Sequence, residues 1–235
     1  MQNNREMQNQ QKDSDSGKVP AGEKINDFIQ NNRKGIIAAF AVFVLVFVGF
    51  IAYFFISDNL NKQAIAEVEE LNRRFIDLQQ DIQEGSSTDM TEKLLADLIE
   101  FAQKKSKFPG SKAWSLAGQI YSQRKDWALA EEAWLNAAKS GEKTYLGPIA
   151  LFQAAAVCEE QGKYERAIEL YRECVSHPFE FPAAPRAQFS IGRLNEQIGN
   201  FPDAIEAYRA VTINWPEIPV WQNLARSRIT AIEIR

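Results

Sequence analysis

The sequence predicts an all-α protein in which one transmembrane helix is followed by an α-solenoid of stacked helical hairpins and a C-terminal capping helix. Two observations carry this prediction. A run of 22 residues without a charge occupies 35–56, and small and aromatic residues recur every 37 residues after position 111. A long uncharged run indicates a membrane span, and a fixed period of about 20–50 residues indicates a repeat architecture.

The first 22 residues predict a disordered cytoplasmic tail. Segment 1–22 is rich in Gln, Asn, Ser and mixed charge and has almost no large apolar side chain, so it cannot bury enough surface to offset the entropy of ordering. In 23–34, Ile25, Phe28 and Ile29 fall on one helical face. This indicates a juxtamembrane helix, which either lies at the headgroups or extends the next helix.

Segment 35–57 is predicted to be the transmembrane helix, because 22 helical residues reach about 33 Å and a bilayer core is roughly 30 Å thick. A cleaved signal peptide fits less well, since its apolar region is usually about 7 to 15 residues. A buried core helix fits less well because no face of the run is polar. Arg33 and Lys34 abut the N-terminal side, which favours a cytoplasmic N-terminus.

Segment 58–110 is predicted to hold a long amphipathic helix and the first, degenerate hairpin. The second helix is expected at 88–107, closed by Pro109-Gly110. The apolar stripe of the long helix suits either a coiled-coil seam between copies of the chain or packing onto the next helix of a solenoid. The stripe residues are Val68, Leu71, Phe75, Leu78 and Ile82.

Residues 111–216 form an internal repeat of three units, expected at 111–147, 148–184 and 185–216. Equivalent positions hold the following residues: Gly118, Ala155 and Gly192; Ala130, Ala167 and Ala204; Trp134, Tyr171 and Tyr208. A repeat of this length is one supersecondary unit that buries its apolar face against its neighbours. The unit is predicted to be a pair of antiparallel helices.

The motif Trp114-x2-Ala117-Gly118-x2-Tyr121, followed by Ala130 and Trp134, resembles the tetratricopeptide pattern W-x2-L-G-x2-Y, A-x3-F. The resemblance implies tetratricopeptide-like hairpins in which small residues let two helices approach closely. The period of 37 departs from the usual 34 and predicts longer turns. Segment 217–235 restarts the first-helix pattern and is expected to be a capping helix with a polar outer face, formed by Arg226, Arg228 and Glu233.

Stacked hairpins of this kind curve into a concave groove lined by the first helix of each unit, which is the expected binding surface. Phe152 and Phe189 occupy the same repeat position, and aromatic rings flanked by arginines suit an extended or helical peptide. The alternative is that both rings pack against neighbouring helices. The candidate binding residues are Gln119, Phe152, Gln153, Glu159, Arg186, Phe189, Arg193 and Glu196.

Composition excludes several classes of function. A net charge of −4 and a pI near 5.3 argue against a nucleic-acid binder. The chain has one histidine, His177, and no phosphate-binding loop or Cys/His metal spacing, so no enzyme, cofactor or metal site is expected. Cys158 and Cys174 are predicted to stay unpaired, because the expected hairpin separates them by roughly 10 Å.

The whole layout, with FIQNNRK entering one anchor and repeats ending near ARSRITAIEI, resembles the YfgM-like ancillary subunits of the Sec translocon. The resemblance implies a single-pass protein of the bacterial inner membrane whose repeats face the periplasm and meet the translocon, chaperones or secreted clients. The third unit is also similar to repeats of outer-membrane assembly and Tol-Pal accessory proteins. The leading hypothesis is therefore a membrane-tethered protein-interaction adaptor. The alternative is an oligomeric structural scaffold in envelope assembly or cell division.

Overall fold

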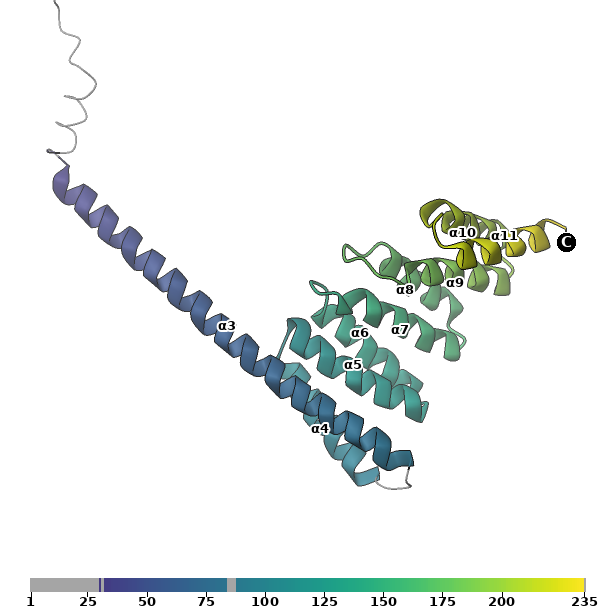
Figure 1. Cartoon of the computed structure of the whole chain (residues 1–235), viewed down its shortest axis with the longest axis horizontal. Coiled ribbons are helices and arrows are strands. Elements are labelled where there is room, and N and C mark those ends of the chain that lie inside the picture. Colours follow the sequence, from purple (N-terminus) through teal and green to yellow (C-terminus); the bar gives the residue numbers. More distant parts are fainter. Residues whose placement is uncertain (1–29, 31, 84–87, 235) are drawn as a thin grey trace, which may run out of the picture. The chain divides into compact units, whose positions relative to one another are not determined.

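The computed structural model describes residue 30, residues 32–83 and residues 88–234. The predicted tail 1–22 and most of the juxtamembrane segment 23–34 lie outside the described residues. Everything described is helix or connection between helices (Figure 1). The chain divides into two compact units, Met1–Asn59 and Leu60–Arg235.

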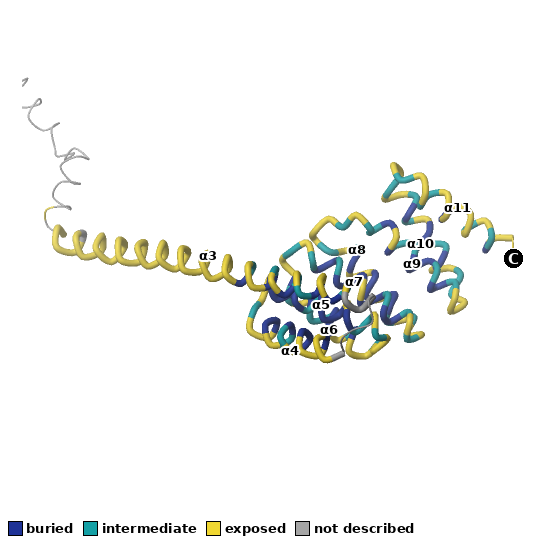
Figure 2. The backbone as a smooth tube through the Cα atoms, turned by 60° about the horizontal axis from the view of Figure 1, so that its bottom comes forward, coloured by how far each residue is buried: buried dark blue, intermediate teal, exposed yellow. Residues whose placement is uncertain are grey.

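Helix α3 (Arg33–Gln83) is 51 residues long and belongs to both units. Its described side chains from 37 to 63 are all exposed, as Figure 2 shows. Phe40 and Phe55, for example, keep 66% and 76% of their surface accessible. By length and composition this helix is apolar enough to cross a membrane. A membrane span and a signal sequence both have this character.

The second unit stacks the end of α3 with eight further helices among the described residues (Figure 1). These are α4 (Thr88–Lys104), α5 (Lys107–Arg124), α6 (Trp127–Ser140), α7 (Leu146–Glu160), α8 (Tyr164–Val175), α9 (Ala184–Gln197), α10 (Phe201–Asn214) and α11 (Pro219–Glu233). Helices α5 and α6, α7 and α8, and α9 and α10 form three hairpins, each packed on the next. This is the predicted fold class.

The apolar stripe of α3 is buried inside its own chain. Val68, Leu71, Phe75 and Leu78 are each at most 7% exposed, and they share one core with Leu94 and other residues of α4, α5 and α6. The side chain of Ile82 lies outside the described residues. These four residues therefore pack onto the next helix of the solenoid, which is one of the two uses that the sequence left open, and the seam between copies was the other. Periodicity alone cannot separate these two uses of an apolar stripe.

Close approach of the helices within each hairpin explains the repeated small residues. Ala130, Ala167 and Ala204 are fully buried. A Cβ atom added at Gly118 would meet the Trp134 ring at 2.9 Å, and one added at Gly192 would meet the Tyr208 ring at 2.6 Å. In each of these hairpins an aromatic ring of the second helix packs directly on the glycine of the first helix. A larger residue than glycine would clash with that ring.

The extra residues of the 37-residue period lie between hairpins. Within a hairpin the connections are 125–126, 161–163 and 198–200, whereas those between hairpins are 141–145, 176–183 and 215–218. One expected break is misplaced, because α4 ends at Lys104 and α5 begins at Lys107. Pro109 and Gly110 lie in the first turn of α5, where proline is tolerated because its missing N–H has no intrahelical partner.

Helix α11 packs against α10 and α9 and exposes the polar residues expected of it, Arg226, Arg228 and Glu233. Two of these also tie the helix to the preceding hairpin, because Arg228 pairs with Glu196 of α9 and Arg209 of α10 pairs with Glu233 at 3.4 Å. The surface of α11 also exposes Val220, at 65%, and other apolar side chains.

Both cysteines are free and buried, as predicted. Burial raises the pKa of each thiol to about 12, with the Glu131 carboxylate adding to the effect at Cys158. The Cys174 thiol donates a hydrogen bond to the Pro148 carbonyl oxygen, at 3.2 Å. Because the thiolate is the reactive form, both side chains should be inert in the folded chain.

We expect iodoacetamide at pH 8 to leave the native protein unlabelled and to add two groups once guanidinium unfolds it without reductant. Mass spectrometry reads both results. A denatured, unreduced chain with neither cysteine labelled would reveal a disulfide and contradict the hairpin geometry.

Candidate functional site

The candidate residues lie on the first helices of the second and third hairpins, α7 and α9, and on α5. We call this surface the first-helix face. It carries two copies of one arrangement. In each copy a phenylalanine ring, a glutamate carboxylate and a tyrosine come from one hairpin, and two further side chains come from the helix that follows this hairpin. The first copy comprises Phe152, Glu159, Tyr171, Arg186 and Arg193.

Phe152 is 8% exposed because aromatic and cationic groups surround it. Its ring centroid lies 5.3 Å from that of Tyr171 and 5.6 Å from that of Phe181, which comes from the connection between α8 and α9. The Arg186 guanidinium lies over the ring, 5.3 Å from the centroid. The ring is therefore held by contacts within the chain, which is the alternative that the sequence left open for it.

Glu159 links two hairpins. Its carboxylate accepts a 2.7 Å hydrogen bond from the Tyr171 hydroxyl of its own hairpin and an ion-paired hydrogen bond from Arg193 of the next. Burial raises the pKa of the Tyr171 phenol, and the bond to the Glu159 carboxylate raises it further. The phenol stays neutral and remains a donor at any physiological pH.

The second copy repeats this geometry one hairpin further along. The Phe189 centroid lies 5.0 Å from Tyr208 and 5.5 Å from Trp221 of α11. Glu196 accepts a 3.1 Å hydrogen bond from the Tyr208 hydroxyl and pairs with Arg228. Burial, followed by the Glu196 charge, raises the pKa of Tyr208 to about 12. Trp221 thus takes the place that Arg186 has in the first copy.

The first hairpin contains a neutral version of the same link. Trp134 Nε1 donates to the Ser122 hydroxyl at 3.2 Å, across the same twelve-residue separation that joins Tyr171 to Glu159. Ala156 stands in α7 at the position that Arg193 has in α9. A hydroxyl carries no charge, so no arginine is needed beside it. The charged links therefore begin only with the second hairpin.

The open hydrogen-bonding groups of the first-helix face are amides and guanidinium groups. Gln119, Gln153 and Arg186 are exposed. Arg193 and Arg228 keep 43% and 45% of their side-chain surface accessible even though each is ion-paired. Sequence reasoning missed Trp221 and Arg228 because the last connection shortens the 37-residue register. It also missed Phe181, which lies outside any helix.

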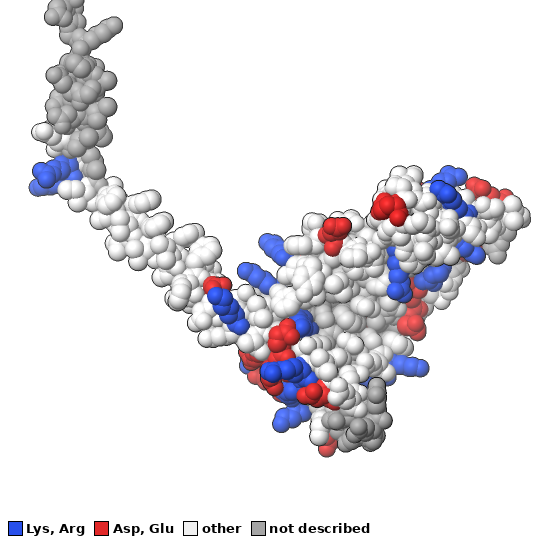
Figure 3. Space-filling model, in the orientation of Figure 1, with Lys and Arg blue, Asp and Glu red and all other residues white. Residues whose placement is uncertain are grey.

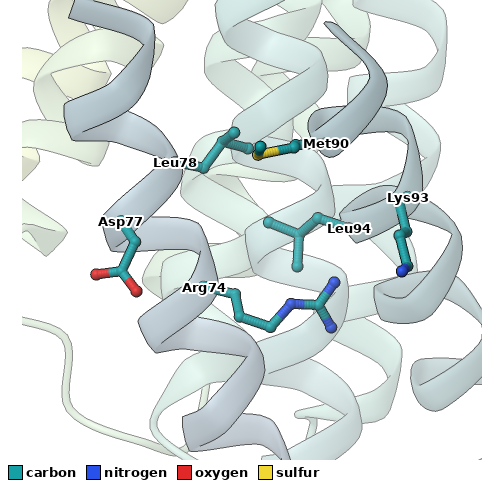
Figure 4. Close-up of a pocket in the computed structure, with 6 residues that line it drawn as sticks. All are labelled: Arg74, Asp77, Leu78, Met90, Lys93 and Leu94. Carbon is teal, nitrogen blue, oxygen red and sulfur yellow. The ribbon is translucent and has the colours of Figure 1, made fainter. Parts of the chain in front are cut away.

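The second unit has several open cavities between its helices and connections. Figure 4 shows one of about 250 Å³ between α3 and α4, where Leu78, Met90 and Leu94 lie close together and Asp77 points away from them. No cluster of metal-binding side chains occurs among the described residues. His177 Nδ1 accepts the Phe179 backbone N–H at 3.2 Å, and burial lowers the pKa of the imidazole. This places His177 in a packing role at the connection between α8 and α9.

Known proteins resemble the region that holds this face. Residues 115–181 and 159–217 each match the tetratricopeptide repeat family model. A TPR repeat-containing protein of Treponema pallidum (strain Nichols) is 33% identical over 122 residues, which cover 52% of this chain and 50% of that protein. The chain thus spans about half the length of this curated relative. The crystal structure of MamA protein aligns over 64% of this chain and 74% of its own, with 20% identity and a TM-score of 0.48.

The repeated residues, the three hairpins and the family match agree with one another. Both family matches lie within the span of α5 to α11, where Gly118, Ala130 and Trp134 begin the register. The chain is therefore an all-α protein in which a long apolar helix near the N-terminus is followed by stacked tetratricopeptide-repeat hairpins.

Proposed function

We propose that the protein is a non-catalytic, membrane-tethered adaptor that binds other proteins on its first-helix face. The observation that carries this proposal is the row of arginines on successive first helices: Arg186 and Arg193 on α9, and Arg228 on α11. Each lies against a group of the preceding hairpin and still presents part of its surface to solvent.

The chemistry of the face selects a class of partner. The carboxylates of Glu159 and Glu196 already accept hydrogen bonds from a tyrosine and an arginine each. Arg193 donates to Glu159 from one nitrogen and Arg228 donates to Glu196 from two. A guanidinium has five N–H donors, so both side chains keep donors that these bonds do not use. The unused capacity consists of donors, so the face suits an extended segment that offers carboxylates or backbone carbonyls.

The apolar part of α3 supplies the tether in this proposal. A membrane anchor keeps the repeats near one surface and raises their effective concentration toward partners there. With the N-terminus in the cytoplasm, the repeats would meet proteins outside it, and the layout resemblance suggests the Sec translocon, periplasmic chaperones or secreted clients. The rival scaffold hypothesis drew on the α3 stripe, and the four described side chains of that stripe, Val68, Leu71, Phe75 and Leu78, are buried within the chain.

Site-specific photocrosslinking in native membranes tests the binding face. We expect a crosslinker at Gln153 to capture partner proteins, and Arg186→Gln to reduce the capture at least several-fold. A crosslinker at exposed Ala128, on the second helix of the first hairpin, is the matched control. Equal capture at both positions, or capture that ignores Arg186→Gln, would contradict the proposed face.

Protease accessibility tests the tether and its orientation. Protease added to spheroplasts should digest the repeats, and alkaline carbonate should leave the chain in the membrane pellet. Release by carbonate would identify a cleaved or peripheral segment. A protected C-terminal unit in intact spheroplasts would reverse the proposed topology.

A further inference from the structure

Three connections of the second unit lie side by side at one edge and form a surface rich in lysine. One cavity, of about 450 Å³, is lined from both the α4–α5 and the α6–α7 connections, and the next is lined from both α6–α7 and α8–α9. The two cavities share Lys139, Glu142 and Lys143. We call the four cations of this surface the lysine edge: Lys105, Lys107, Lys139 and Lys143.

The cations of the lysine edge have no partners among the described residues. None of the four side-chain amines makes an ion pair there, and Glu142 is the single carboxylate that lines the first cavity. At the opposite ends of the same helices Lys163 pairs with Glu131 at 2.8 Å and Arg124 with Glu92 at 2.6 Å, whereas the neighbouring Lys125 makes no ion pair among the described residues. Figure 3 shows Lys and Arg side chains on several sides of the stacked helices, some beside Asp or Glu and others standing alone. Four cations without an ion pair in the described part of the chain therefore gather around the two cavities of this edge, whereas Lys93, Lys125 and Arg226 stand singly elsewhere.

Aromatic side chains stand among these lysines. Tyr145 is 55% exposed and its ring lies 5.9 Å from that of Phe108, while Phe179 is 39% exposed. Lysines interleaved with exposed aromatic rings are the combination found where proteins meet lipid headgroups, because the rings are amphipathic and the amines pair with phosphates.

The lysine edge lies beside α3 within the second unit. Glu67 of α3 lines one cavity together with Lys104 and Lys105, so the α4–α5 connection is next to that part of α3.

We propose that the lysine edge binds anionic phospholipid headgroups of the membrane in which the chain is anchored. The proposal rests on the membrane tether proposed above. Each lysine that reaches an anionic surface strengthens binding about fivefold at physiological salt, so four lysines and the aromatic rings hold the repeats against the bilayer. The first-helix face would then be presented at a fixed height above the lipid.

Headgroup quenching in reconstituted vesicles tests this. The full chain carries a fluorophore on Gln103→Cys, at an exposed position of the first cavity; the native thiols are buried. Vesicles contain a nitroxide headgroup lipid in phosphatidylcholine, with or without 30% phosphatidylglycerol. We expect quenching only with phosphatidylglycerol and expect 0.5 M NaCl to remove most of it. The triple variant Lys107→Asn, Lys139→Gln, Lys143→Gln should lower it at least fivefold.

A matched variant controls for net charge and backbone. Lys93→Gln, Lys125→Asn, Arg226→Gln removes the same charge at exposed positions elsewhere, and Lys107 and Lys125 share a left-handed backbone with φ of 58° and 62°. Equal loss in both variants, or equal quenching without phosphatidylglycerol, would overturn the proposal. An edge variant that keeps its quenching but loses crosslinked protein would assign the lysines to an acidic protein partner instead. Failure of the chain to float with any vesicle would refute the tether and with it this proposal, whereas flotation without quenching would overturn the lysine edge alone.

Discussion

Replacing Ala167 with tryptophan is expected to destabilise the second unit by about 3 kcal/mol or more, the upper end of overpacking costs. Ala167 is fully buried in the largest core cluster, where α8 crosses α7 beside Cys158. An indole has no space there unless the hairpin opens. For a unit of this size the loss corresponds to a fall of roughly 6 to 12 °C in melting temperature.

Thermal unfolding of the full chain in detergent, followed by circular dichroism, measures this effect. Ala130→Trp occupies the equivalent position of the first hairpin and should behave in the same way. The control is Ala128→Trp, because Ala128 lies on the same helix as Ala130 but is exposed. An unchanged midpoint in both buried variants would mean that the 37-residue register is not the packing register.

The packing register could be predicted because it repeats three times. Glycine at 118 and 192 recurs with an aromatic residue sixteen positions later, Trp134 and Tyr208, because each ring lies against the glycine of its own hairpin. Repetition therefore turns a weak propensity signal into a strong one. The α3 stripe occurs once, so its pattern fitted a seam and a core equally well. Only the position of α4 decides between these uses.

The partners of the candidate residues could not be predicted from their positions alone. The arginine that reaches Glu159 is 34 residues away and the one that reaches Glu196 is 32 residues away, because the connections differ in length. An alignment on the 37-residue period therefore includes Arg193 among the candidate residues and omits Arg228. The lysine edge was missed for a related reason, since its members come from two connections whose adjacency depends on how the hairpins stack.

The substitution Tyr208→Ala is expected to cost about 3 to 5 kcal/mol in the last hairpin, within the range for large aromatic deletions. Tyr208 is fully buried, packs against Gly192 and Phe189, and donates to Glu196. Tyr208→Phe keeps the ring and removes only the hydroxyl, so it should cost about 0.5 to 1.5 kcal/mol.

The loss at Tyr208 should stay local. Tyr208 belongs to a small cluster of five buried residues in α10 and α11, which is separate from the twenty-residue cluster that holds Tyr171. In a solenoid each repeat contacts only its neighbours, so weakening the last one opens that end first. Hydrogen exchange should show amides of α10 and α11 losing protection in Tyr208→Ala while those of α5 to α7 keep theirs. The equivalent Tyr171→Ala should instead lower protection on both sides of α8, because that ring lies between two hairpins. Uniform loss of protection in Tyr208→Ala would show that the stack unfolds as one cooperative block, and that the last hairpin is not an independently opening end.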